Sequence, residues 1–128
     1  MRKEEYIGTI EIRGYKVDVG MDDYGQQYFF EYEEDGEIKT IGCGAFQTDF
    51  IECICYHFDP KGWRISMFGE EALNNWIQHI KDVMADRITR GASEDVINSY
   101  KEKIYHLEND DYDLYDFNAL YKNLGLSR

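Results

Sequence analysis

Hydrophobic and polar residues alternate near the start of the chain, with the period of two that is typical of β-strands with one buried face. Two such runs meet at Arg13-Gly14, and folding them about this dipeptide places Ile12 opposite Tyr15 and Ile10 opposite Val17. The same register sets Glu11 across from Lys16, and opposite charges at such a position modestly stabilise a sheet. The pattern therefore predicts an antiparallel hairpin. Its loop geometry is less well specified than its pairing, because Arg is a poor first residue for a two-residue primed turn.

The alternation continues further along the chain. Tyr28, Phe30 and Tyr32 share one face of a third expected strand, and Asp35-Gly36 turns the chain into a short segment, 37–41. These runs add a third strand and a short further segment to the expected sheet.

The stretch 46–68 has two interpretations. A helical face is one, because the spacing is close to 3.6 residues for Phe46, Phe50, Ile51, Ile54 and Phe58. The other is a hairpin closed by the turn signal Asp59-Pro60-Lys61-Gly62, with Phe58 opposite Trp63, Tyr56 opposite Ile65 and Ile54 opposite Met67. We favour the hairpin, since its register separates an apolar face from a mostly polar one.

The second half of the chain has the periodicity of helices. One apolar stripe begins after Gly69 and runs through Leu73, Trp76, Ile77, Ile80, Val83, Met84 and Ile88. Ser93 is a suitable N-cap for a second helix, and Gly125 ends a third, shorter one. We therefore expect a single α+β domain over 1–128. It has a meander-like antiparallel sheet of about five or six strands within 5–68 and two or three amphipathic helices within 70–125. These helices are expected to pack on one sheet face, which includes Tyr15, Val17, Trp63 and Ile65.

The acidic net charge of the chain argues against two classes of function, direct binding to nucleic acid and binding to anionic membranes. The chain of 128 residues carries 26 Asp and Glu against 14 Lys and Arg, a net charge of -12. Direct binding to nucleic acid or to an anionic membrane surface is not expected, because both need clustered basic side chains. No apolar run has the length of a membrane span or a secretory signal. The three cysteines are an odd number, which favours reduced thiols in the cytoplasm.

Two acidic segments interleaved with tyrosine are the first candidate site. They suggest an anionic surface that binds a basic partner protein. In the most specific version of this hypothesis, the carboxylates imitate the phosphates of nucleic acid. The alternative is a solvated surface that only aids solubility. The candidate partner-binding residues are Glu31, Glu33, Glu34, Asp35 and Glu37 in one segment and Glu108, Asp110, Asp111, Tyr112, Asp113, Tyr115 and Asp116 in the other.

The second candidate is a ligand or enzyme site on the open face of the expected hairpin, with residues Cys53, Cys55, His57, Arg64 and Ser66. Alternation along one strand would place the first three on one face. The spacing lacks a zinc-binding pattern, and the run from Asp110 to Asp113 lacks the glycine and glutamate of a calcium loop. We therefore expect no metal, no cofactor and no catalytic residue, and favour a non-enzymatic protein-binding module. A self-associating structural subunit is the third alternative.

Overall fold

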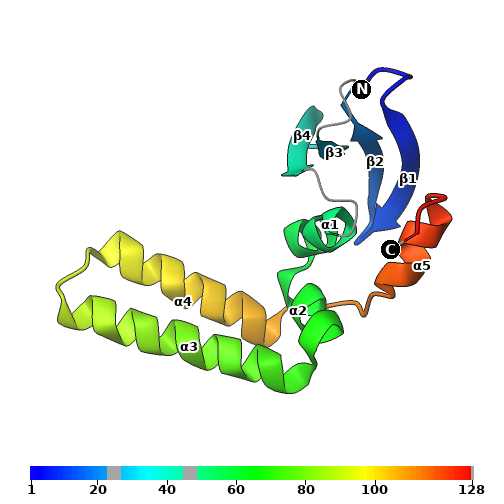
Figure 1. The fold of residues 1–128 in the computed structure, drawn as a ribbon. Helices are drawn as coiled ribbons and strands as arrows, with labels where there is room; N and C mark the ends of the chain where they lie inside the picture. The colour runs from blue at the N-terminus through cyan, green and yellow to red at the C-terminus, as the bar shows by residue number, and fades with distance from the viewer. Residues whose placement is uncertain (23–26, 45–48, 128) are drawn as a thin grey trace. The chain divides into compact units, whose positions relative to one another are not determined.

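The computed structural model describes residues 1–22, 27–44 and 49–127, which form a four-stranded antiparallel sheet and five helices. The α+β class is confirmed. The expected five or six strands and two or three helices are wrong in number. The chain divides into two compact units, and each is described by itself (Figure 1). The first unit comprises Met1–Asp59 and Tyr115–Arg128, and the second comprises Pro60–Leu114.

The sheet of the first unit is a meander in which each strand pairs with its neighbours in the chain. Its strands, in the order β1-β2-β3-β4, are Tyr6–Ile12, Tyr15–Met21, Tyr28–Glu34 and Glu37–Gly44. The predicted register of the first hairpin is confirmed, including the pair Glu11 and Lys16. Arg13 and Gly14 both have positive φ, 50° and 82°, the requirement of a tight primed turn. Arg13 therefore adopts the left-handed conformation in spite of its side chain.

One face of this sheet forms the core of the first unit. The helix α1 (Phe50–Phe58) packs on it, with the rings of Phe50 and Tyr28 stacked at 4.4 Å between centroids. The short helix α5 (Phe117–Asn123) brings Tyr121 against Phe50. The sheet residues buried on this face are Ile10, Ile12, Val17, Val19, Tyr28, Phe30 and Tyr32. The predicted inward faces of the first three strands are therefore confirmed at these positions.

The hairpin expected over 53–67 is wrong, because the structure has two helices there, α1 and α2 (Pro60–Phe68). Helical spacing places Ile51, Ile54 and Cys55 on one buried face of α1. Pro60 is the first residue of α2, where a helix tolerates proline because the missing N–H has no intrahelical partner to lose. The turn signal thus marks a boundary between two helices. Phe46, part of the helical alternative, lies outside the described residues.

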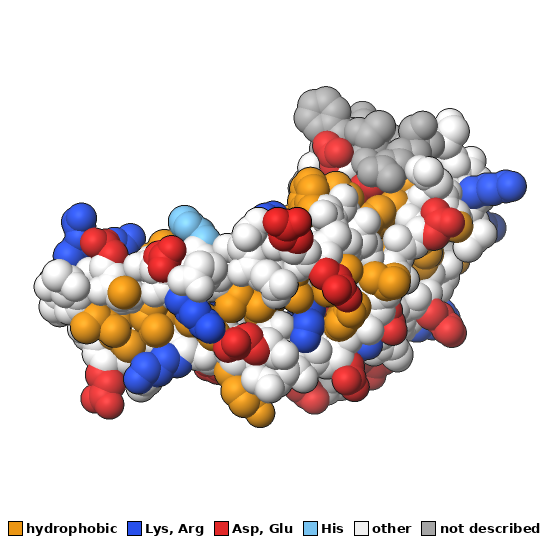
Figure 2. Space-filling view, turned by 90° about the horizontal axis from the view of Figure 1, so that it is seen from below, with side chains coloured by type: hydrophobic (Ala, Val, Ile, Leu, Met, Phe, Trp, Pro, Cys, Tyr) orange, Lys and Arg blue, Asp and Glu red, His pale blue; other side chains and the backbone are white. Residues whose placement is uncertain are grey.

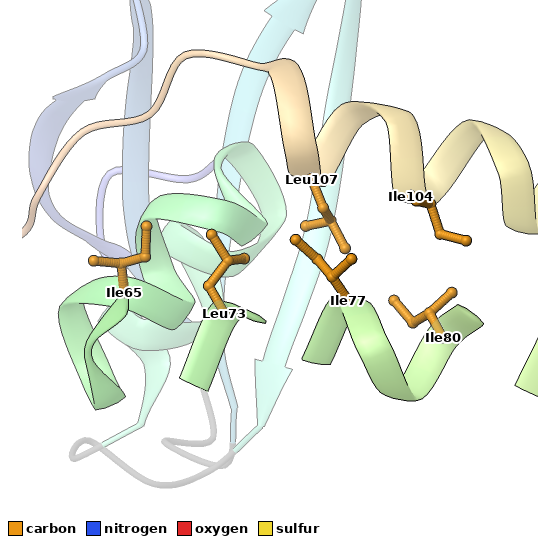
Figure 3. Close-up of a cluster of buried hydrophobic side chains, with 6 residues drawn as sticks. All are labelled: Ile65, Leu73, Ile77, Ile80, Ile104 and Leu107. Carbon is orange, nitrogen blue, oxygen red and sulfur yellow. The ribbon is translucent and has the colours of Figure 1, made fainter. Parts of the chain in front are cut away.

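The second unit is a helical hairpin with α2 at its base. The helices α3 (Glu70–Thr89) and α4 (Glu94–Asn109) run antiparallel (Figure 1). Ser93 caps α4 as predicted, accepting a hydrogen bond from the Val96 N–H at 3.4 Å. Figure 3 shows the side chains of three helices pointing toward one another in its core: Ile65 from α2, Leu73, Ile77 and Ile80 from α3, and Ile104 and Leu107 from α4.

The placement of helices on the sheet also differs from the expectation. Within the first unit α1 contacts β3 and β4 and α5 contacts α1, whereas α3 and α4 belong to the other unit. Trp63 and Ile65, expected on the sheet, lie on α2. Across the described ranges, no helix combines the length and apolar character needed to cross a membrane.

Candidate binding surfaces

The first acidic segment, Glu31–Glu37, forms the end of β3, a tight turn and the start of β4. Glu31 accepts hydrogen bonds from the N-terminal ammonium group at 3.2 Å and from the Thr40 hydroxyl at 3.4 Å. Glu34 accepts a hydrogen bond from the Tyr15 hydroxyl at 3.1 Å, and Glu37 lies 3.4 Å from the Lys39 ammonium. Part of the negative charge of this segment is therefore compensated within its own unit.

The sheet face opposite the core carries a shallow depression beside this segment. Its volume is about 220 Å³, and the side chain of Ile38 in its lining is 65% exposed. The other lining residues are Lys16, Asp18, Glu31, Tyr32 and Glu33. Its charged lining consists of three carboxylates and one ammonium group, so the depression favours a cationic ligand over an anionic one.

The second acidic segment, Glu108–Asp116, runs from the last turn of α4 to the N-cap of α5. Glu108 lies 3.4 Å from the Lys81 ammonium, and the Asp116 carboxylate accepts a hydrogen bond from the Ala119 N–H. Asp110 to Leu114 are all exposed and form no helix or strand. Leu114 is 71% exposed and Tyr112 is 36% exposed. The middle of this segment therefore presents carboxylates, a phenol ring and an aliphatic side chain to solvent.

Lys61, at the start of α2, holds the beginning of this stretch. Its ammonium group donates a hydrogen bond to the Asp110 carbonyl oxygen at 2.8 Å and lies 5.3 Å from the centre of the Tyr112 ring. His106, one turn before Asp110, is 3.0 Å from its carboxylate. The hydrogen bond and negative charge of Asp110 raise the pKa of the exposed His106 above its usual value.

A groove of about 340 Å³ lies in the second unit beside Lys61. Buried Leu73, Ile77 and Leu107 contribute aliphatic surface to it. Its polar lining comes from Lys61, Asn74, Gln78, Lys81 and Glu108. The volume is at the lower end of the range of small-ligand sites, and an aliphatic side chain of a partner also fits such a space. The groove adjoins the exposed stretch, because Lys61 both lines the groove and binds the Asp110 carbonyl oxygen.

The alternative ligand site does not have the geometry that a strand would give it. Cys53, Cys55 and His57 lie on α1, where residues two apart point about 200° apart around the axis. Arg64 and Ser66 lie on α2, in the other unit. The expectation that alternating residues share a face is therefore wrong.

The environments of Cys55 and His57 do not resemble an activated pair. Burial, together with the charges of Glu52 and Asp59, raises the pKa of the Cys55 thiol to about 12. His57 Nε2 lies 2.8 Å from the Tyr32 hydroxyl, and burial lowers the His57 pKa in spite of the opposing charge of Glu34. A nucleophilic cysteine needs a stabilised thiolate and an adjacent base, which this arrangement does not supply.

Two features were not anticipated from the sequence. Cys43 of β4 and Cys53 of α1 form a hydrogen bond between their thiols, and burial is the main cause that raises the pKa of Cys43. Two buried carboxylates of the α1 region are bound by tyrosines near the C-terminus: Glu52 by the Tyr121 hydroxyl and Asp59 by the Tyr115 hydroxyl, each at 2.7 Å. Recognising these pairs requires the helical assignment of 50–58, which the hairpin interpretation had excluded.

Within the part of the chain that the structure describes, no group of three or more His, Cys, Asp or Glu side chains is arranged to hold a metal ion. Comparison with known proteins finds no match to the chain among protein-family models, curated proteins or solved structures. The functional conclusion therefore rests on the surfaces themselves.

Proposed function

We propose that this chain is a non-enzymatic protein-binding module that docks the segment Glu108–Asp116 on a basic surface of a partner protein. The observation that carries the proposal is the continuous exposure of Asp110 to Leu114, in which carboxylates flank a tyrosine and an aliphatic side chain. Carboxylates steer a basic partner and fix its orientation, while tyrosine and leucine supply contact area that loses water on binding.

The adjoining groove supports the same proposal. A partner that places basic side chains near Asp111 and Asp113 reaches the mostly polar neighbouring groove, where the buried Leu73, Ile77 and Leu107 expose little surface. The polar side chains of the groove offer such a partner hydrogen bonds of the kind found at the rim of an interface. The segment Glu31–Glu37 is the weaker candidate, because its tyrosine, Tyr32, is buried in the core and Glu31 and Glu34 are only partly exposed.

The class of partner follows from the charge. With a net charge of -12, the chain repels nucleic acid. It attracts proteins with basic surfaces, and nucleic-acid-binding proteins have such surfaces. The specific form of the proposal is an inhibitor or modulator of a nucleic-acid-binding protein, of the kind that phages and mobile elements use against host defences. We place it in the cytoplasm, where its thiols stay reduced.

The test is capture of partners by the tagged full chain from a nuclease-treated lysate, washed at low and at high salt. An unrelated acidic protein of similar size and charge serves as the control bait. The proposal predicts specific recovery of a nucleic-acid-binding protein that is released by high salt and by duplex DNA. Recovery of the same proteins by both baits, or retention that neither salt nor DNA reduces, would contradict it.

A further inference from the structure

A cluster of two cations and aromatic rings lies on the helical unit, and we call it the aromatic–basic surface: Arg64 and Phe68 of α2, Trp76 of α3 and Lys103 of α4. The Arg64 guanidinium carbon lies 5.0 Å from the centre of the Phe68 ring and 5.6 Å from that of Trp76. The Lys103 ammonium lies 5.3 Å from the centre of the Trp76 ring. The Phe68 side chain is 57% exposed. Each of the three helices therefore contributes to one patch, in which Phe68 and Lys103 are exposed and Arg64 and Trp76 are partly buried.

These two cations differ from three other basic side chains of the same unit. Lys81 pairs with Glu108, and both Arg87 and Arg90 pair with Asp86. Within the described ranges neither Arg64 nor Lys103 forms an ion pair; the recorded hydrogen bond of Arg64 runs from Nε to the Ala72 carbonyl oxygen at 3.4 Å. In a chain with nearly two acidic residues for every basic one, both cations contact aromatic rings instead of carboxylates.

The patch lies apart from the acidic docking segment. On α3, Trp76 is two residues from both Asn74 and Gln78, which line the groove beside that segment. A separation of two residues corresponds to about 200° around a helix, so Trp76 points to the other flank of α3. Binding at the aromatic–basic surface is therefore independent of docking through the acidic segment. Figure 2 shows, on one face of the molecule, hydrophobic side chains exposed among charged ones along the helical unit.

We propose that the aromatic–basic surface binds an acidic peptide segment of a partner protein, with carboxylates on Arg64 and Lys103 and an apolar side chain against Phe68. A guanidinium group that stacks on rings is held in place and keeps edge donors for a carboxylate, which lowers the entropic cost of the contact. A peptide is favoured over single-stranded nucleic acid, although aromatic rings with cations bind both. Two cations neutralise few phosphates, whereas a short peptide needs only two carboxylates to pair with them.

Tryptophan fluorescence gives a direct assay of the patch. The chain has two tryptophans, Trp76 within the patch and Trp63, whose ring lies 6.0 Å from that of Phe68. The full chain is titrated with a short synthetic peptide of Asp and Glu around one central leucine. The matched control peptide has Asn and Gln in their place. We expect a saturable change in emission with the acidic peptide, and affinity roughly tenfold weaker for the amide peptide.

Variants locate the contact. Arg64→Gln and Lys103→Gln, each checked for native circular dichroism, should each weaken binding of the acidic peptide several-fold, the size expected for one exposed charge contact. Lys101→Gln is the control, because it makes the same charge change on the opposite side of α4, two residues from Lys103. Equal affinity for both peptides, no saturable change, equal effects of all three variants, or tighter binding of an oligothymidine probe would each overturn the proposal.

Discussion

Replacing Tyr121 with phenylalanine removes one hydroxyl from the core of the first unit and leaves the ring in contact with Phe50. The hydroxyl is fully buried, donates a hydrogen bond to Glu52 Oε2 at 2.7 Å and accepts one from the Ile51 N–H at 3.3 Å. A hydrogen bond to a charged group contributes about 1.5–3 kcal/mol, and removing one partner leaves a buried group that water does not reach. We expect the Tyr121→Phe variant to lose about 2–4 kcal/mol in the free energy of unfolding.

The assay is urea unfolding followed by far-ultraviolet circular dichroism, together with amide hydrogen exchange of the first unit. Hydrogen exchange assigns the loss of stability to the first unit. Tryptophan fluorescence cannot do so, because both tryptophans lie in the second unit. The control is Tyr105→Phe, since Tyr105 is 61% exposed and its change should stay within about 0.5 kcal/mol. A loss for Tyr121→Phe no larger than that of the control would refute the assignment of a stabilising tyrosine–carboxylate pair.

Two further predictions concern thiol modification and titration. Because the Cys55 side chain is fully buried whereas Cys43 and Cys53 are partly exposed, iodoacetamide at pH 8 should modify Cys55 slowest of the three cysteines unless the chain is first unfolded. Peptide mass spectrometry that finds Cys55 modified as fast as either of the others would contradict this. The pKa of His106 is raised by Asp110, so protonated His106 should stabilise the end of α4 below its ordinary pKa, and this contribution should disappear as pH rises through the folded value. Nuclear magnetic resonance titration of Asp110→Asn should show a lower midpoint for His106; an unchanged midpoint would contradict the pairing.

The sheet was predictable because its local and long-range signals agree. Alternation selects the buried face, and the pair Glu11 and Lys16 selects the register. The long helices were predictable for a similar reason, since a stripe from Leu73 to Ile80 recurs at helical spacing and Ser93 supplies a cap. The structure of residues 50–68 was not predictable, because the aromatic and β-branched residues there fit both the strand period of two and the helix period of 3.6. A proline that looks like a turn residue is in fact the first residue of a helix.

The candidate surfaces were predictable only in part. Composition identified the segment Glu108–Asp116, but it could not show that Glu108 lies beside Lys81 or that the run from Asp110 to Leu114 is exposed throughout. The aromatic–basic surface needs side chains from three helices, and no spacing along the sequence brings Arg64 to Trp76. The face that Cys53, Cys55 and His57 would share on a strand does not exist on a helix, since a change of period changes which residues share a face.

The most direct test of the central claim is the affinity of the captured partner for charge-neutralised variants, measured by calorimetry at two salt concentrations. One variant changes Asp110, Asp111 and Asp113 to asparagine, a second neutralises Glu33, Glu34 and Asp35, and a control neutralises exposed Glu71, Asp82 and Glu94 of the helical unit. The account predicts that the first variant loses roughly tenfold or more in affinity and much of its salt dependence, while the control loses little. Affinity unchanged in both acidic-segment variants, or reduced equally by the control, would contradict docking through the acidic segment.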